Sequence, residues 1–196
     1  MNQKIRHLDP TGVRAVAHPL RMQLLFALRR GGAATASQLA AKLGESSGST
    51  SYHLRQLAAQ GFVEDDPEHQ GEGGRERWWR AAFTGIQVDT GELLKHPDPE
   101  VRGAMSLYLQ EVAARHTLEL STWLGTMHEW SEAWRAMANQ SDYGLKLTPE
   151  RALELGDKID ELINSYRDDP VDAEGAGYVR IHLHLFPSTD TPEELS

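Results

Sequence analysis

Apolar positions recur at helical spacing in three short segments of the first sixty-odd residues. The first segment opens at Pro19 and its apolar positions are Leu20, Leu24, Leu25 and Leu28. The second opens at Thr35 and Gln38, which have the spacing of a capping box. In the third, Ser46 caps a helix whose inward face carries Thr50, Leu54 and Leu57. The turn Gly44-Glu45-Ser46 joins the last two segments, so the pattern predicts a helix-turn-helix.

A β-hairpin is predicted directly after these helices. One strand begins at Phe62-Val63, a turn-rich loop covers residues 67–74, and the returning strand covers 75–82. Trp78 and Trp79 then lie on opposite faces of a strand, so one of them is expected in the core. A hairpin in this place makes the domain a winged helix.

The second half of the chain is predicted to be mainly helical. Residues 83–97 form a connector, Asp98-Pro99 begins a long helix that runs to about Gln140, and Thr148 caps a further helix. Short strands are predicted at Tyr143–Leu147 and at Tyr178–Phe186, where apolar and polar residues alternate. The expected fold is therefore mainly α with a small β component. A winged helix-turn-helix domain over residues 1–88 precedes a helical domain over 89–196, which we expect to serve dimerisation and to be able to hold an effector.

Charge is divided unevenly between the two halves. The 196 residues carry a net charge of −9, yet residues 1–82 contain 11 Lys and Arg against 8 Asp and Glu, a balance of +3. Docking on nucleic acid depends on local charge, so the first half is suited to phosphates and the second half is not. There is no cysteine, no apolar run long enough to cross a membrane and no signal-peptide pattern, which predicts a cytoplasmic protein without membrane contact.

Small polar residues crowd the start of the helix that opens at Ser46. Such residues let a recognition helix enter the major groove, which is ~12 Å wide, and arginine is the side chain best suited to guanine. The arginines of the second hairpin strand are placed to grip phosphates or a narrow minor groove, although a solvated face could also pair them with Glu72 and Glu76. The predicted DNA-contacting residues are Ser46, Ser47, Gly48, Ser49, Ser51, Tyr52, His53, Arg55, Gln56, Arg75, Arg77 and Arg80.

Four short motifs in order resemble the ArsR-type winged-helix repressors, over roughly residues 10–82. They are Ala17-His-Pro-Leu-Arg21, Ser37-Gln-Leu-Ala40, Ser51-Tyr-His-Leu-Arg-Gln-Leu57 and Gly61-Phe-Val63. The resemblance implies that residues 46–60 form the recognition helix and that 75–80 lie on the wing. It also implies a homodimer that binds a partly palindromic operator in double-stranded DNA, usually as a repressor.

The chain departs from the metal-sensing members of that family. It has no Cys-x-Cys motif, and His116, Glu119 and His128 match a His/carboxylate site only loosely, so the resemblance is to an extended, cysteine-free subgroup. No metal or cofactor is therefore expected. A sensor with His and carboxylate ligands stays open as an alternative, because His182 and His184 lie on one face of the predicted strand.

A stripe of apolar and aromatic residues at steps of three and four follows the long helix. Such a stripe favours a helix–helix seam between two copies over an aromatic ligand pocket, and the two are compatible. The predicted dimer-interface residues are Leu109, Val112, His116, Leu120, Trp123, Met127, Trp130 and Trp134.

Catalytic motifs are absent from the sequence. There is no phosphate-binding P-loop, no Gly-x-Ser-x-Gly, no His-Glu-x-x-His and no cysteine nucleophile, so no catalytic residue is assigned and an enzyme is not expected. The sequence predicts a DNA-binding regulator. The alternatives are the metal-responsive sensor and a winged helix that contacts only protein.

Overall fold

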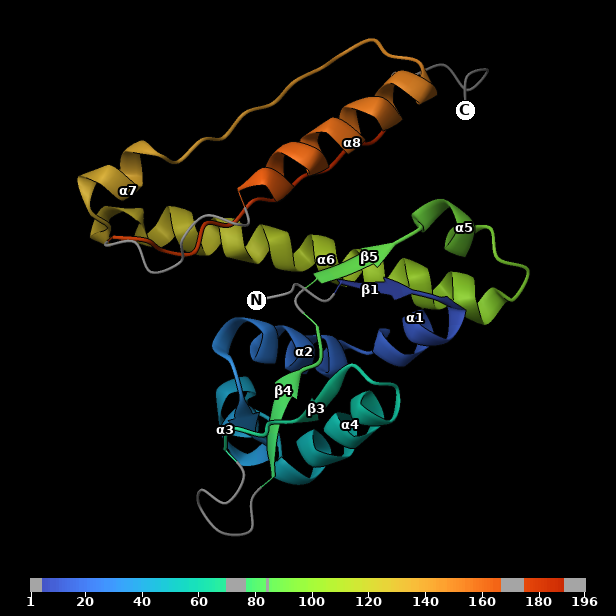
Figure 1. Ribbon diagram of the computed structural model, residues 1–196, viewed down its shortest axis with the longest axis vertical. Helices are drawn as coiled ribbons and strands as arrows, with labels where there is room; N and C mark the ends of the chain where they lie inside the picture. Colours follow the sequence, from blue (N-terminus) through green and yellow to red (C-terminus); the bar gives the residue numbers. More distant parts are fainter. Residues whose placement is uncertain (1–4, 70–76, 84, 167–174, 189–196) are drawn as a thin grey trace. The chain divides into compact units, whose positions relative to one another are not determined.

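The computed structural model describes residues 5–69, 77–83, 85–166 and 175–188. The chain divides into two compact units, Met1–Trp123 and Leu124–Ser196, and each is described by itself. As expected, the protein is mainly helical with a few short strands, and the winged helix-turn-helix comes first (Figure 1).

Four helices build the first part of unit one. They are α1 (Pro10–Val16), α2 (Pro19–Gly31), α3 (Ala36–Leu43) and α4 (Ser47–Ala59). The predicted capping box is present: the Thr35 hydroxyl accepts from the Gln38 amide at 3.3 Å, and the Gln38 side chain accepts from the Thr35 amide at 2.9 Å. Gly44 ends α3 with φ of +70°, a conformation that side chains with a Cβ rarely adopt. The chain can therefore turn sharply into α4, which packs against both α2 and α3.

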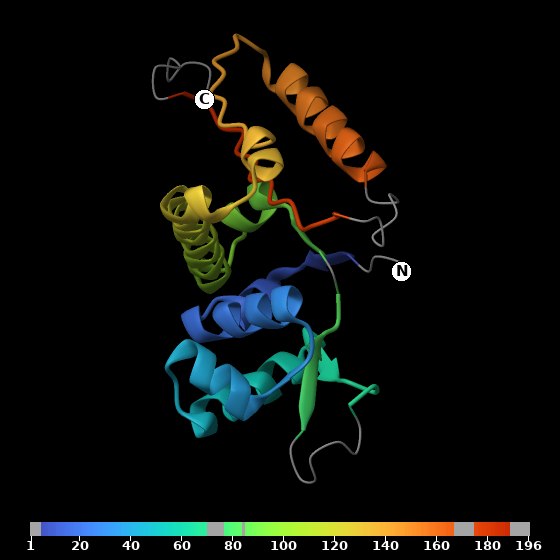
Figure 2. The same ribbon diagram turned by 90° about the vertical axis from the view of Figure 1, so that its left-hand side faces the viewer.

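The wing is an antiparallel sheet of three strands in the order β2-β4-β3. Its strands are β2 (Ala34–Thr35), β3 (Val63–Asp65) and β4 (Trp78–Ala81), and β4 lies against α2 (Figure 2). Trp79 is 3% exposed, whereas Trp78 is half-buried and stacks on His69. The predicted hairpin, with one tryptophan in the core, is thus confirmed.

A second sheet joins two segments that the sequence did not mark as strands. β1 (Ile5–Leu8) pairs in parallel with β5 (Gly85–Val88), and α5 (Thr90–Leu94) follows. Residues 85–88 belong to the segment that we predicted as a connector, and no strand was predicted before residue 10. Each strand has only four residues and its partner is eighty residues away, so neither segment shows a period that a sequence pattern can reveal.

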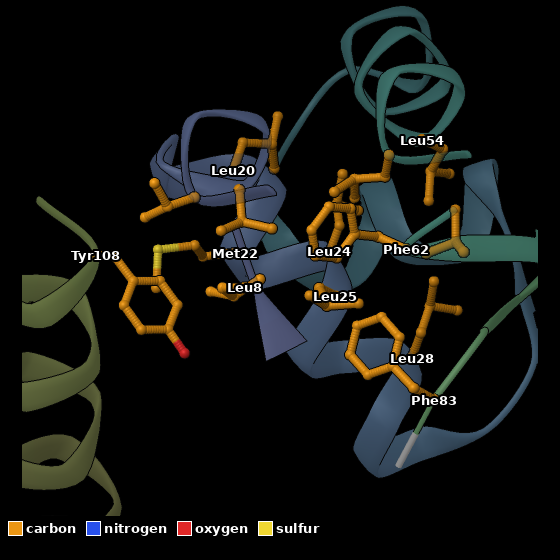
Figure 3. Packing of buried hydrophobic residues seen from close by; sticks show 14 of the residues in the cluster. Leu8, Leu20, Met22, Leu24, Leu25, Leu28, Leu54, Phe62, Phe83 and Tyr108 are labelled. Atoms are coloured by element: carbon orange, nitrogen blue, oxygen red, sulfur yellow. The ribbon is translucent and has the colours of Figure 1, made fainter. Parts of the chain in front are cut away.

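The core of unit one joins the winged helix to the first turns of α6 (Pro99–Thr126). Leu24 from α2, Leu54 from α4 and Phe62 before β3 are all fully buried. Tyr108 from α6 reaches toward Met22 of α2 (Figure 3). Burying a side chain of this size stabilises the fold by roughly 1.5–3 kcal/mol relative to leaving it exposed, so this cluster fixes α4 against α2.

The described part of the second unit contains the end of α6, two short elements and one longer helix. α6 ends at Thr126 and is followed by the 3₁₀ turn η1 (Met127–Glu129), α7 (Glu132–Ala136) and α8 (Pro149–Ser165). The helix that we expected to reach Gln140 is thus interrupted after Thr126. Within this unit the rings of Trp130 and Trp134 meet edge to face at 6.3 Å.

The prediction of two strands in the second half of the chain is wrong. Neither Tyr143–Leu147 nor Tyr178–Phe186 has strand structure, and Tyr178, Leu145 and Phe186 are exposed. An alternating pattern produces a strand only where another strand supplies backbone hydrogen bonds, and the described residues offer these segments no such partner. None of the described helices is long and apolar enough to cross a membrane.

Candidate nucleic-acid interface

Helix α4 turns one face into the core and leaves the other face accessible. Thr50, Leu54 and Leu57 are buried, as the sequence predicted. The predicted contact residues lie on the remaining surface. Ser46, Ser47, Gly48, Tyr52, Arg55 and Gln56 are exposed, and Ser49, Ser51 and His53 are half-buried.

The N-terminal turn of α4 combines small side chains with ordered backbone. The Ser46 hydroxyl accepts from the Ser49 amide at 3.2 Å, which fixes the start of the helix. Apart from the adjacent backbone of α4, no atom of the described residues lies within 4 Å of the position that a Cβ on Gly48 would occupy, so this turn is open on its outer side. A helix N-terminus of this kind presents backbone N–H groups and a partial positive charge to an approaching anion.

Arg55 is the cation at the middle of this surface. It is exposed, and it has no ion pair or hydrogen bond within the described part of the chain. An unpaired guanidinium can donate two parallel hydrogen bonds to a guanine edge. The structure therefore leaves the predicted base-reading side chain available.

The wing arginines are held differently. Arg77 binds both carboxylate oxygens of Asp65 on β3, with Nη2 donating at 2.7 Å, and its guanidinium lies 4.0 Å from the ring centre of Trp79. This hydrogen bond lowers the pKa of Asp65 and raises the pKa of Arg77, and so favours the charged form of each side chain.

Arg80 is paired in the same way. Its Nε and Nη2 donate to one oxygen of Glu64 at 2.9 and 2.7 Å, and its Nη1 lies 3.6 Å from the buried Asp66. The alternative that the wing arginines pair with acidic neighbours therefore holds for Arg77 and Arg80, although their partners are on β3. The partners that we had named, Glu72 and Glu76, lie outside the described residues, as does Arg75.

Two imidazoles meet where α2 crosses α4. The rings of His18 and His53 are 4.3 Å apart between centroids, and His53 also contacts Tyr52 edge to face at 5.2 Å. Burial lowers the pKa of both histidines, and the nearby Arg21 guanidinium lowers each pKa further, while Glu45 acts in the opposite direction. Both rings are therefore favoured in the neutral form.

The side chains of Arg21 and His18 were not among the predicted contact residues. Both belong to a short motif in α2, but the sequence does not reveal that this turn packs against His53. Only the helix crossing brings them together. A basic residue three positions after the histidine that caps a helix was the available signal, since positions three apart share a helix face.

The predicted dimer residues are spread over several environments. Leu109 and Val112 pack against the core of their own unit, and His116 and Trp123 are half-buried on α6. Leu120, Met127 and Trp130 are exposed, and Trp134 is half-buried.

The histidines considered for a metal site are not gathered into one. His182 and His184 lie in the segment that has no strand structure, and Glu119 is paired with Arg115 at 2.7 Å. In the described ranges, no three side chains from His, Cys, Asp or Glu lie close enough together to hold a metal ion.

Comparisons with known proteins agree with the helix-turn-helix geometry. A family model described as a helix-turn-helix domain matches residues 16–66, which span α2, α3, α4 and β3. No curated protein matches the sequence.

Two solved structures of Lactococcus lactis ZitR are similar to this chain. The C30AH42A mutant is 14% identical, with a TM-score of 0.29 over 76% of this chain and 74% of that chain. The same mutant in apo form is 13% identical, with a TM-score of 0.30 over 76% and 82%. Likenesses of this strength do not bear on what the chain binds. The matched domain alone supports a DNA-binding transcriptional regulator.

Proposed function

We propose that the protein is a sequence-specific repressor of the ArsR type, from an extended and cysteine-free subgroup, that binds a palindromic operator as a homodimer. One observation carries this proposal: the N-terminal half of α4 is capped, lined with small polar residues and accessible, while its opposite face is locked into the core. A recognition helix needs this combination, because it must come close to base edges without losing its position on the domain.

Charge and side-chain chemistry support DNA over protein as the partner of this surface. Residues 1–82 carry a balance of +3 in a chain of net charge −9. Ser47, Ser51 and Arg55 supply hydroxyl and guanidinium donors for phosphates and bases. The surface of α4 that would meet a partner exposes a single large ring, that of Tyr52 at 53%, and so lacks the aromatic cluster typical of the centre of a protein interface.

Dimerisation is proposed for the part of the chain after residue 88, with residues 1–88 reading DNA. Leu120, Met127 and Trp130 are apolar and between 37% and 47% exposed, so burying them against a second copy is favourable. A two-fold dimer would hold two copies of α4 about one DNA turn apart, ~34 Å, which matches the two halves of a palindrome. The occupied operator would then be closed to transcription.

A selection experiment tests the proposal as a whole. The full chain is used to enrich duplexes from a random library, and the molar mass of the enriched complex is measured by light scattering. We expect an inverted repeat with half-sites about one turn apart, bound by two chains. Enrichment of no sequence above the starting library would contradict the proposed function, and a single half-site bound by one chain would contradict the dimer.

A further inference from the structure

The crossing of α2 and α4 holds two polar nitrogens that have no partner within the described part of the chain. Nε of Arg21 and Nδ1 of His53 are both buried and make no hydrogen bond. The one hydrogen bond of the Arg21 side chain is a long one, from Nη2 to the carbonyl oxygen of Arg14 at 3.4 Å. A buried donor without an acceptor is destabilising, so an acceptor that binds at this helix crossing would be favoured.

The cluster formed by His18, Arg21, Tyr52 and His53 carries positive charge that no carboxylate neutralises directly. Arg21 has no ion pair within the described ranges, in contrast to Arg77 and Arg80 on the wing. Burial lowers the pKa of Arg21, and the Tyr52 side chain raises it. Glu45 is the acidic group near the two imidazoles, where it raises their pKa without forming an ion pair. A second anion is therefore electrostatically favoured here.

The geometry points to the origin of that anion. Tyr52, which contacts His53, is exposed on the same surface of α4 as Arg55. The cluster thus adjoins the face that would enter the major groove, where the nearest anions are backbone phosphates. We propose that Arg21, with Tyr52 and His53, forms a binding site for one DNA backbone phosphate; the site rests on the proposed function of α4.

The two imidazoles serve mainly to position the neighbouring side chains of the site, because both rings are favoured in the neutral form. His18 Nδ1 accepts a hydrogen bond from the Leu20 amide at 3.2 Å, which caps α2 and leaves the proton of the neutral ring on Nε2. The ring of His18 packs against that of His53, with 4.3 Å between the ring centroids, and so limits where the His53 ring can lie. The phosphate receives its charge-assisted hydrogen bonds from the guanidinium of Arg21 and a neutral bond from the Tyr52 hydroxyl.

If this site exists, α2 supplies a phosphate contact. That contact would fix the position of α4 along the major groove. Phosphate contacts set register and orientation, whereas base contacts select sequence. Loss of Arg21 should therefore weaken binding to every duplex by a similar factor and leave the base preference of Arg55 unchanged.

A test with chemically neutralised DNA isolates this contact. Duplexes that carry single methylphosphonates are scanned for binding to the full chain and to the Arg21→Gln and Arg30→Gln variants. Arg30 is exposed in the last turn of the same helix and serves as the matched loss of charge. We expect one neutralised phosphate per half-site to cost about 10-fold in affinity for wild type and for Arg30→Gln, but to cost nothing for Arg21→Gln.

A second variant separates charge from structure. Arg21→Lys keeps the charge and should restore most of the salt dependence, whose slope falls by ~0.9 for each lost contact. If Arg21→Gln responds to every methylphosphonate as wild type does, while wild type still selects an operator, the phosphate site is refuted and the proposed function stands. If wild type selects no DNA, both fail.

Discussion

Arg77 and Asp65 form a two-point ion pair across the β3–β4 hairpin, so this wing guanidinium has an anionic partner before any DNA approaches. Arg80 is also paired, since two of its nitrogens donate to one carboxylate oxygen of Glu64. Within the described residues, by contrast, neither Arg55 on α4 nor Arg21 on α2 forms an ion pair with a carboxylate. This distribution shifts the expected electrostatic contact from the wing to the helix pair.

Releasing a wing arginine should strengthen DNA binding. In Asp65→Asn the guanidinium of Arg77 loses its carboxylate, so it becomes available to a phosphate and the salt dependence should steepen by up to ~0.9 in slope. The measurement is fluorescence anisotropy with an unrelated duplex at several salt concentrations. Asp142→Asn, an exposed carboxylate of the second unit, is the control, and equal slopes in the two variants would show that Arg77 does not reach DNA.

Arg55→Ala should lower the affinity for the selected operator by about 1–3 kcal/mol and reduce discrimination at one base position per half-site. The reason is that Arg55 is exposed on the accessible face of α4 and forms no ion pair with any described residue. Competition between the operator and single-base variants of it measures both effects. An unchanged base preference, with a uniform loss for all duplexes, would assign Arg55 to a phosphate instead.

Thr50 is buried in α4, and its hydroxyl has no hydrogen-bond partner among the residues that the structure describes. Thr50→Val keeps the shape of the side chain and removes the unsatisfied oxygen, so the free energy of unfolding should stay level or rise by about 1 kcal/mol. Thr50→Ser keeps the oxygen, loses a buried methyl and should cost about 1 kcal/mol. Urea unfolding of both variants decides the matter, and a Val variant less stable than the Ser variant would reveal a hydrogen bond at this oxygen.

Folding stability should decline as the pH falls below about 6.5, the ordinary value for histidine. The pKa values of His18 and His53 are lowered in the folded protein, first of all by burial, so the unfolded chain binds more protons in this range. The stability difference is fully present above pH 6.5 and is lost as the pH falls toward the lowered values. Protonation of His18 at Nδ1 would also remove the cap on Leu20.

The midpoint of thermal unfolding, followed between pH 8 and pH 5, measures this effect. His53→Gln should flatten the dependence, because it removes one of the two histidines whose pKa is lowered. His128→Gln is the matched control, because this histidine is exposed on η1. The same dependence in all three proteins would assign the pH response to other groups.

Most of the winged helix could be predicted from the sequence because its signals are local. Thr35, Gln38 and Ser46 mark helix starts through bonds to residues three positions away, and Leu54 and Leu57 repeat at helical spacing. The accessible face of α4 follows from the same period. These expectations needed no knowledge of distant parts of the chain.

The features that were missed depend on contacts between distant segments. β1 and β5 pair across eighty residues, and His18 meets His53 only because α2 crosses α4. The ion pairs of Arg77 and Arg80 depend on the register of β3 against β4, which sets Asp65 opposite Trp79 and Glu64 opposite Arg80. The segment Tyr178–Phe186 was wrongly predicted as a strand for a related reason. Its apolar and polar residues alternate, but a local period does not form a strand without a pairing partner.

Placing a negative charge at the start of α4 tests the central claim most directly. Ser47→Glu sits in the first turn of the helix, where a carboxylate favours folding through the helix dipole. Gln140→Glu, at an exposed position outside the predicted dimer interface, is the matched control. If α4 enters the groove, Ser47→Glu should bind the selected operator at least about 10-fold more weakly than the control, at equal or higher thermal stability. Equal affinity of the two variants would mean that α4 does not contact DNA.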